Sequence, residues 1–241
     1  MSADQKPLSP SLEGELVLTD VIRRLAVYPY FVRLSLPRDY ADPDRLRSQL
    51  DAIHGPAGVC VTRIRIEPEA PTRQGPTTQL SRTSRAMPLH TDSSYEERPH
   101  ELIAFQMVQA DRSGGQSMLA PVDDVLGMLD DETVDALHQP LFPFGPFKRP
   151  ILEGTGHQTR VRYYRRQIAP GLDPLQPKSA ACIAAMNNLD HALAEVGQAH
   201  RANLQAGDVL FMNNHKVLHG RTALPADSAR LMYRYRKHLS A

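Results

Sequence analysis

The chain has 241 residues, and its 28 Lys and Arg side chains nearly balance 27 Asp and Glu, which leaves a formal net charge of +1. Such balance argues against the clustered basic surface that nucleic acids or anionic membranes require. No apolar run approaches the roughly 18 residues of a membrane span, and the N-terminus lacks the apolar core of a signal peptide. Two cysteines do not make a disulfide framework. We therefore expect a cytoplasmic protein with a small-molecule substrate and leave its oligomeric state open.

A chain of this length suits one domain. Residues 1–14 are polar and contain proline, so we expect a flexible N-terminal arm followed by a domain that spans 15–241. Asp42-Pro43 is a favourable helix start, with a capping side chain and then proline at the first helical position. The first part of the chain is predicted to form a helix at 16–27, a strand at 31–36, a helix at 43–53, a strand at 59–66 and a loop at 69–88.

Strands predominate after residue 89, and helices are confined to inserts between them. This pattern is typical of a mainly β fold with helical cover, built on a jelly-roll core. An apolar face of Cys182, Met186, Leu189 and Leu193 supports the longest helix. Strands are predicted at 102–108, 117–119, 159–168, 201–204, 209–212 and 229–239, helices at 121–129, 132–137 and 179–196, and an irregular segment at 139–150.

The sequence His90-Thr91-Asp92 is a candidate metal-binding motif. Mononuclear iron oxygenases bind Fe(II) through two histidines and one carboxylate on one face, which leaves three positions open. His90 and Asp92 are two residues apart, so on a strand both side chains point to the same side. The third ligand has to come from another strand, and His219 is the candidate. Each piece alone is weak, since such patterns arise by chance and a lone histidine is usually structural.

Two arginines after His219 strengthen the metal hypothesis. Arg230 and Arg234 are four residues apart, so on a strand they share a face at a separation of about 13 Å. Arginine binds carboxylates through two parallel hydrogen bonds, and 2-oxoglutarate carries a distal carboxylate. Ser117, just after Gly114-Gly115, offers a hydroxyl for the same group.

Four stretches of the chain resemble the TauD/TfdA-type (taurine dioxygenase and clavaminate synthase-like) group of Fe(II)/2-oxoglutarate oxygenases. They are LHTDSSYEERPHELIAFQMV, GGQSMLAPVDDVL, RVRYYRRQI and AGDVLFMNNHKVLHGRTALPADSARLMYR, which lie within roughly residues 85–236. The resemblance implies a double-stranded β-helix, the jelly-roll core of cupin-like proteins. It also implies Fe(II) as cofactor, with 2-oxoglutarate and O2 as cosubstrates.

The resemblance also implies roles for individual residues. It implies three iron ligands, His90, Asp92 and His219. Arg230 would bind the 2-oxoglutarate carboxylate, and Ser117 stands where the family often has threonine. The second arginine of the taurine enzyme helps to bind an anionic substrate, so Arg234 is a candidate for that role. Halogenating relatives lack the metal carboxylate, so the presence of Asp92 disfavours halogenation.

Further substrate candidates flank the metal motif. Arg82 and Arg85 lie on the loop that leads to His90, where they would bind a substrate anion or remain solvated loop charges. Tyr95 follows the motif and would line the substrate entrance. Beyond the metal ligands, we predict no catalytic residue.

The expected function is oxidation, by hydroxylation, of an unactivated C–H bond in a small anion-bearing substrate. An amino acid or biosynthetic intermediate, free or carrier-bound, fits this description, and 2-oxoglutarate would be decarboxylated to succinate. Desaturation or cyclisation by the same centre is an alternative. A zinc or iron hydrolase or isomerase on a jelly-roll barrel is another, although it would not need Arg230 and Ser117. A non-catalytic binding protein is a third, which the intact ligand set argues against.

Overall fold

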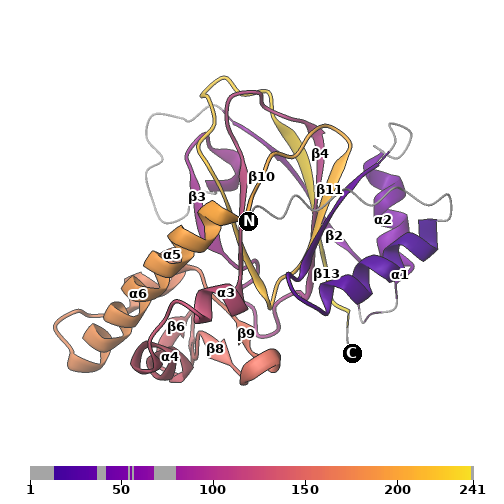
Figure 1. Cartoon of the computed structure of the whole chain (residues 1–241). Helices are drawn as coiled ribbons and strands as arrows, with labels where there is room; N and C mark the ends of the chain where they lie inside the picture. Colours follow the sequence, from indigo (N-terminus) through magenta and orange to yellow (C-terminus); the bar gives the residue numbers. More distant parts are fainter. Residues whose placement is uncertain (1–13, 37–41, 54, 56, 68–79, 240–241) are drawn as a thin grey trace.

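Two antiparallel sheets form the centre of the structure, a computed structural model that describes residues 14–36, 42–53, 55, 57–67 and 80–239 (Figure 1). The larger sheet contains, in spatial order, β1 (Phe31–Ser35), β11 (Asp208–Asn213), β4 (Leu102–Gln109), β13 (Leu231–Lys237) and β2 (Cys60–Arg65). The smaller sheet contains β10 (Arg201–Ala202), β5 (Ser117–Pro121), β12 (Val217–Arg221) and β3 (Met87–His90). Neighbours in space are mostly distant in sequence, as in a jelly roll.

The two sheets bury a shared apolar layer. Ile103 and Phe105 of β4 pack in one cluster with Leu119 of β5 and Val217 of β12. Because side chains alternate between the faces of a strand, the same strands present other residues to the outer layers. Burial of this layer fixes the distance between the sheets, and the candidate site lies between them.

Two N-terminal helices cover the outer face of the larger sheet (Figure 1). They are α1 (Gly14–Leu25) and α2 (Pro43–Asp51). Asp42 caps α2 by accepting a hydrogen bond from the Asp44 N–H at 3.0 Å, and Pro43 takes the first turn, as predicted. Leu50 of α2 is fully buried against this sheet. The arm expected at 1–14 lies outside the described residues except for Gly14, where α1 begins.

Helices and short strands cover the outer face of the smaller sheet, on the opposite side of the molecule (Figure 1). The helices are α3 (Val122–Leu126), α4 (Asp131–His138), α5 (Arg165–Ile168) and α6 (Pro177–Ala199), with 3-10 turns η3 (Gly156–Gln158) and η4 (Ala169–Gly171). The short strands are β6 (Phe142–Phe144), β7 (Phe147–Arg149), β8 (Leu152–Glu153) and β9 (Arg160–Val161). The apolar face predicted for α6 is buried here.

The strand predicted at 159–168 is wrong beyond Val161. Tyr163 and Ile168 are both fully buried in the same core, and five residues apart they would face opposite sides of a strand. The chain instead turns into α5, while the Tyr163 hydroxyl donates to Asp190 Oδ1 at 2.6 Å. The irregular segment predicted at 139–150 also differs, since it contains the β6–β7 hairpin.

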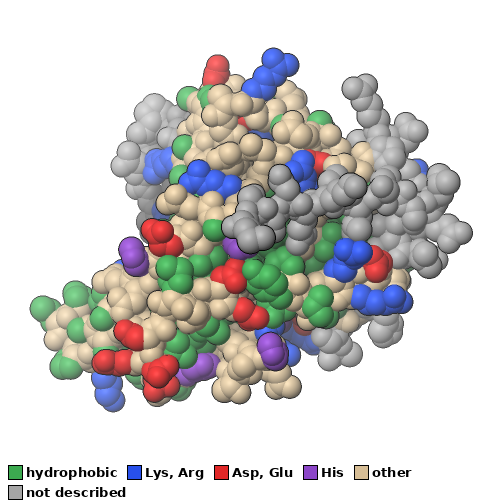
Figure 2. Space-filling view, in the orientation of Figure 1, with side chains coloured by type: hydrophobic (Ala, Val, Ile, Leu, Met, Phe, Trp, Pro, Cys, Tyr) green, Lys and Arg blue, Asp and Glu red, His purple; other side chains and the backbone are tan. Residues whose placement is uncertain are grey.

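The loop predicted at 69–88 is described only from residue 80, where η2 (Leu80–Arg82) leads into β3. No helix in the described ranges is long and apolar enough to cross a membrane. Over the described part of the face shown in Figure 2, side chains of both charges occur side by side. This mixture agrees with the near-balanced composition.

Candidate metal centre

The three predicted ligands meet between β3 and β12. His219 on β12 lies opposite His90 on β3 in the sheet register. The Nε2 atoms of His90 and His219 lie 3.6 Å and 3.7 Å from Asp92 Oδ1. All three side chains are buried, and their candidate ligand atoms fall within 4.8 Å of one another. The structure therefore brings together residues that are 129 positions apart at most (219 − 90 = 129).

Asp92 reaches the centre from a turn, because β3 ends at His90. The Thr91 N–H donates to the Tyr163 carbonyl at 2.8 Å, and Ser93 takes a left-handed backbone conformation with φ 57°. The expectation that Asp92 lies on the strand with His90 is therefore wrong in its local structure. The Asp92 side chain nevertheless points to the same centre as His90. The turn that carries it is held by Tyr163, which lies outside the sheet.

The donor set fits a divalent transition metal. His90 Nδ1 lies 2.9 Å from the Pro88 carbonyl, an arrangement that places the proton on Nδ1 and leaves the Nε2 lone pair free for a metal. Asp92 Oδ2 is buried without a hydrogen-bond partner in the structure. A buried carboxylate oxygen without a partner is costly, and a bound cation would remove that cost. Two imidazoles and one carboxylate suit Fe(II) with open positions.

Electrostatics hold the ligands in the protonation states that metal binding needs. Burial, together with the neighbouring His90, lowers the pKa of His219 to about 4. Burial raises the pKa of Asp92, but the Arg234 guanidinium and the two imidazoles outweigh this and hold it well below its ordinary value. At neutral pH the site thus presents a neutral His219 and an ionised Asp92, as ligation requires.

A narrow cavity on one side of the triad contains the predicted cosubstrate residues. Ser117 and Arg230 line it together with His90 and His219. Arg230 is buried, and this burial lowers its pKa to about 10, so that it keeps its charge at neutral pH. No carboxylate of the described residues lies within ion-pair distance of its guanidinium. A buried cation in this state is suited to an anionic ligand.

Arg221 is a further residue of the site, which was not among the residues predicted from the sequence. In the structure it lines the narrow cavity, and its Nη2 donates to the carbonyl oxygens of Thr83 and Arg85. Its Nε and Nη1 are buried without partners, and burial lowers its pKa to about 10. The sequence could have indicated this position, because Arg221 follows His219 by two residues on β12 and its side chain therefore lies on the same face of the strand.

A second cavity of about 450 Å³ opens on the other side of the triad. Three predicted substrate residues line it, namely Arg82, Tyr95 and Arg234. Arg234 borders both cavities and contacts Asp92 Oδ1 through Nη1 at 3.1 Å. Arg85 is not among the lining residues. The lining also contains Tyr164, Arg166, Gln167 and Arg236, which were not predicted as substrate contacts.

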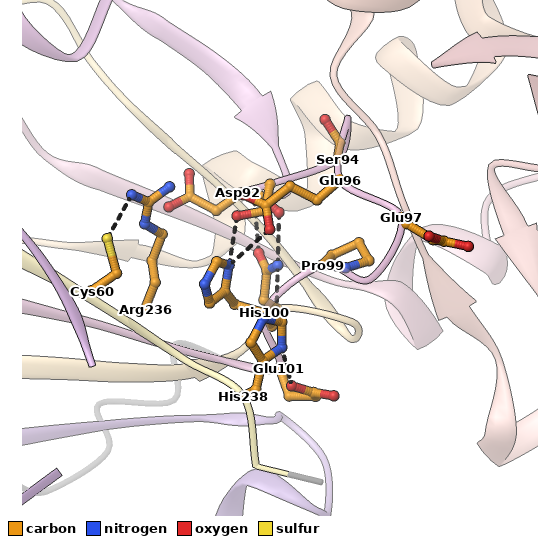
Figure 3. Close-up of polar contacts among 12 residues, drawn as sticks. Cys60, Asp92, Ser94, Glu96, Glu97, Pro99, His100, Glu101, Arg236 and His238 are labelled. Atoms are coloured by element: carbon orange, nitrogen blue, oxygen red, sulfur yellow. Dashed lines mark hydrogen bonds and ion pairs between the residues drawn. The ribbon is translucent and has the colours of Figure 1, made fainter. Parts of the chain in front are cut away.

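Glu96, His100 and His238 form a second cluster of possible metal ligands behind Asp92 (Figure 3). The His100 and His238 rings are stacked, with centroids 4.2 Å apart and planes 16° apart. The nitrogen lone pairs lie in the ring planes, and because the two planes are stacked and nearly parallel, the lone pairs do not converge on one ion. His238 Nδ1 instead lies 3.1 Å from Glu101 Oε2, and His100 Nδ1 lies 2.7 Å from Ser93 Oγ. These contacts brace the turn that carries Asp92.

The fold and the site together define a non-haem metal oxygenase on a jelly-roll core. Residues 61–236 match the model of the taurine catabolism dioxygenase TauD, TfdA family. The match spans most of the chain, and the chain therefore belongs to this family. The finding confirms the Fe(II)/2-oxoglutarate oxygenase family, and the dioxygenase class, expected from the motifs. No curated protein matches the chain.

Solved structures with the same fold include two oxygenases and the protein PvcB. Asparagine oxygenase with Fe(II), 2S,3S-3-hydroxyasparagine and succinate has a TM-score of 0.70 at 18% identity, over 93% of this chain and 80% of its own. OrfP, a non-heme iron oxygenase with Fe and alpha-ketoglutaric acid, has a TM-score of 0.61 at 16% identity, over 92% and 80%. PvcB from Pseudomonas aeruginosa has a TM-score of 0.64 at 18% identity, over 95% and 81%. These similarities confirm the predicted fold class.

Proposed function

We propose that this chain is an Fe(II)- and 2-oxoglutarate-dependent hydroxylase of a small, anion-bearing substrate such as an amino acid. The observation that carries the proposal is the position of the His90, Asp92 and His219 centre between two cavities. One cavity contains the buried Arg230, which has no carboxylate partner among the described residues, and the other is bordered by Arg234. A cosubstrate and a substrate can therefore approach the same metal from different sides.

Each side chain has a distinct task in this proposal. His90, Asp92 and His219 hold the iron, which when bound supplies the O2 chemistry that couples decarboxylation of 2-oxoglutarate to hydroxylation. Arg230 and Ser117 bind the distal carboxylate of 2-oxoglutarate in the narrow cavity. Arg234 neutralises Asp92 on one side and presents charge to the substrate on the other. The buried walls exclude water from the reacting atoms.

The comparisons support an amino-acid-like substrate without identifying it. One similar structure holds 2S,3S-3-hydroxyasparagine, and another holds (3S)-hydroxy-L-Arg, each with succinate. The 450 Å³ cavity is of the size that small-molecule sites usually have. Tyr95, Arg82 and Arg234 line it and are the substrate contacts that we propose, whereas Arg85 is exposed and does not line it.

An anaerobic titration with Fe(II) and 2-oxoglutarate tests the proposal. We expect a visible charge-transfer band from the chelated complex, and succinate formation once O2 is admitted. His90→Ala and Asp92→Ala should abolish both signals. His191→Ala is the matched control, because His191 is exposed on α6. A wild-type protein without the band, or ligand variants that retain it, would contradict the assignment.

A further inference from the structure

The substrate cavity carries more positive charge than its described lining neutralises. Arg82, Arg166, Arg234 and Arg236 line it. Arg82 is paired with Glu67 at 2.5 Å, and Arg234 is paired with Asp92 at 3.1 Å. Arg166 and Arg236 have no carboxylate within ion-pair distance in the described ranges. Arg166 interacts with the Tyr164 hydroxyl, but no described carboxylate neutralises the charge of either guanidinium.

Arg236 is directed into the cavity by the pleat of β13. It shares a face with Arg234 and with Met232, which packs between the two sheets. Its Nη2 contacts Cys60 Sγ at 3.1 Å, and its Nε is buried without a hydrogen-bond partner (Figure 3). Asp92 is close enough to act on this guanidinium electrostatically, but it already contacts Arg234. Arg236 therefore has hydrogen-bonding capacity that the described part of the chain does not use.

Arg166 approaches the cavity from the opposite wall. It follows Tyr164, whose ring centroid lies 5.0 Å from that of the metal ligand His90. Gln167 also lines the cavity and accepts a hydrogen bond from Ser94 Oγ at 2.6 Å, which ties α5 to the turn after Asp92. A substrate bound at the metal thus lies between a wall that carries Arg166 and a strand that carries Arg236.

Unpaired charges in a partly buried site are costly until a counter-charge arrives. A guanidinium recognises carboxylate and phosphate oxygens through paired hydrogen bonds. We infer that the substrate carries two anionic groups, one held at Arg234 and the second held by Arg166 and Arg236. This inference rests on the proposed function and narrows its substrate class to small acids with a second carboxylate or phosphate. A cationic substrate would meet mainly positive charge.

The test uses acids and their neutral counterparts. The probes are L-aspartate against L-asparagine, L-glutamate against L-glutamine, and O-phospho-L-serine against L-serine. Binding is followed by the change each probe causes in the visible band of the anaerobic Fe(II)/2-oxoglutarate complex. We expect at least one acid to bind tenfold or more tightly than its counterpart. Comparison of aspartate and glutamate with phosphoserine shows whether the second anionic group is a carboxylate or a phosphate.

Variants assign the effect to the two arginines. Arg166→Gln and Arg236→Gln should each weaken binding of the acid tenfold or more and leave the affinity of the neutral counterpart within threefold. Arg63→Gln, on the exposed face of β2, is the matched control and should behave as wild type. If a glutamine variant does not form the band at all, the corresponding lysine variant is measured in its place. Lysine keeps the positive charge but lacks the paired N–H donors of the guanidinium, so this variant should bind the acid more weakly than wild type.

Three results would overturn the inference. They are equal binding of acids and neutral counterparts, no binding of any acid, and an acid preference that survives both arginine variants. In each case the band itself shows whether iron and 2-oxoglutarate are bound. A wild-type band without acid preference therefore leaves the oxygenase assignment standing, whereas loss of the wild-type band contradicts the proposed function itself.

Discussion

Asn214 holds the backbone of Asp92 through both ends of its side-chain amide. The Asp92 N–H donates to Asn214 Oδ1 at 2.8 Å, and Asn214 Nδ2 donates to the Asp92 carbonyl at 2.9 Å. The same Nδ2 donates to the His100 carbonyl at 2.9 Å, and the side chain is fully buried. Because Asp92 lies beyond the end of β3, this amide replaces the sheet in positioning the metal carboxylate.

Asn214→Ala should therefore weaken metal binding. Loss of a residue that orients a ligand typically lowers metal affinity by about 10- to 100-fold, and we expect that range in a Co(II) or Fe(II) titration. Asn188→Ala is the control, since its Nδ2 on α6 donates a hydrogen bond of the same length, 2.9 Å, to Thr133 Oγ1 on α4. Unchanged metal affinity in a folded Asn214→Ala protein would show that the turn holds Asp92 without this amide.

Arg230→Gln should weaken 2-oxoglutarate binding and leave metal binding intact. Truncation of one partner of a buried charge pair costs on the order of 2–5 kcal/mol, which the visible band of the anaerobic complex measures as a higher dissociation constant. Arg201→Gln, exposed on β10, is the control. If 2-oxoglutarate affinity instead falls in Arg221→Gln and stays constant in Arg230→Gln, the carboxylate is bound by Arg221.

The metal-free protein should lose stability as the pH falls from about 6.5 towards 4. The pKa of His219 is lowered to about 4 in the folded chain, against an ordinary value of about 6.5 in the unfolded chain. Between these values the unfolded chain binds a proton that the folded chain does not. The contribution is therefore fully present above pH 6.5 and is lost on acidification, by on the order of 1 kcal/mol per pH unit.

Urea unfolding at pH 7, 6 and 5 in the presence of a chelator measures this dependence. His219→Gln removes the titrating group, so its free energy of unfolding should depend less steeply on pH. The half-buried His100 and His215 keep some dependence in the variant, because burial lowers the pKa of each. Identical slopes for the wild type and the variant would mean that His219 is not kept neutral by its surroundings.

Tyr163→Phe should destabilise the wall that carries Arg166. The buried Tyr163 hydroxyl donates to Asp190 Oδ1 at 2.6 Å, and loss of a buried hydrogen bond to a charged group costs roughly 1.5–3 kcal/mol. Thermal unfolding measures the loss. Tyr28→Phe, in a half-exposed position, removes a longer hydrogen bond to Asp124 at 3.2 Å and should cost less. Equal effects in the two variants would contradict this assignment of the anchoring contact.

The sequence by itself determined the features that depend on local spacing. Apolar patterns located the strands of the larger sheet and, in the smaller sheet, β5 and β10, and Asp42-Pro43 placed the start of α2. They did not locate β12, and β3 begins within the segment predicted as a loop at 69–88. The identity of the ligand set was also readable, because chemistry restricts iron sites to few residue types. Arg221 could also have been predicted as a site residue, since it lies two residues after His219 on a strand and therefore shares its face.

Tertiary structure alone decided how Asp92 is held and where the substrate cavity ends. Asn214 is 122 residues from Asp92, and no local pattern reports such a contact. The segment after Val161 alternates like a strand, but burial of both Tyr163 and Ile168 in one core forces a turn and thereby places Arg166 opposite Arg236. Packing over long sequence separations outweighs local propensity, and the side of the site that faces the substrate depends on such packing.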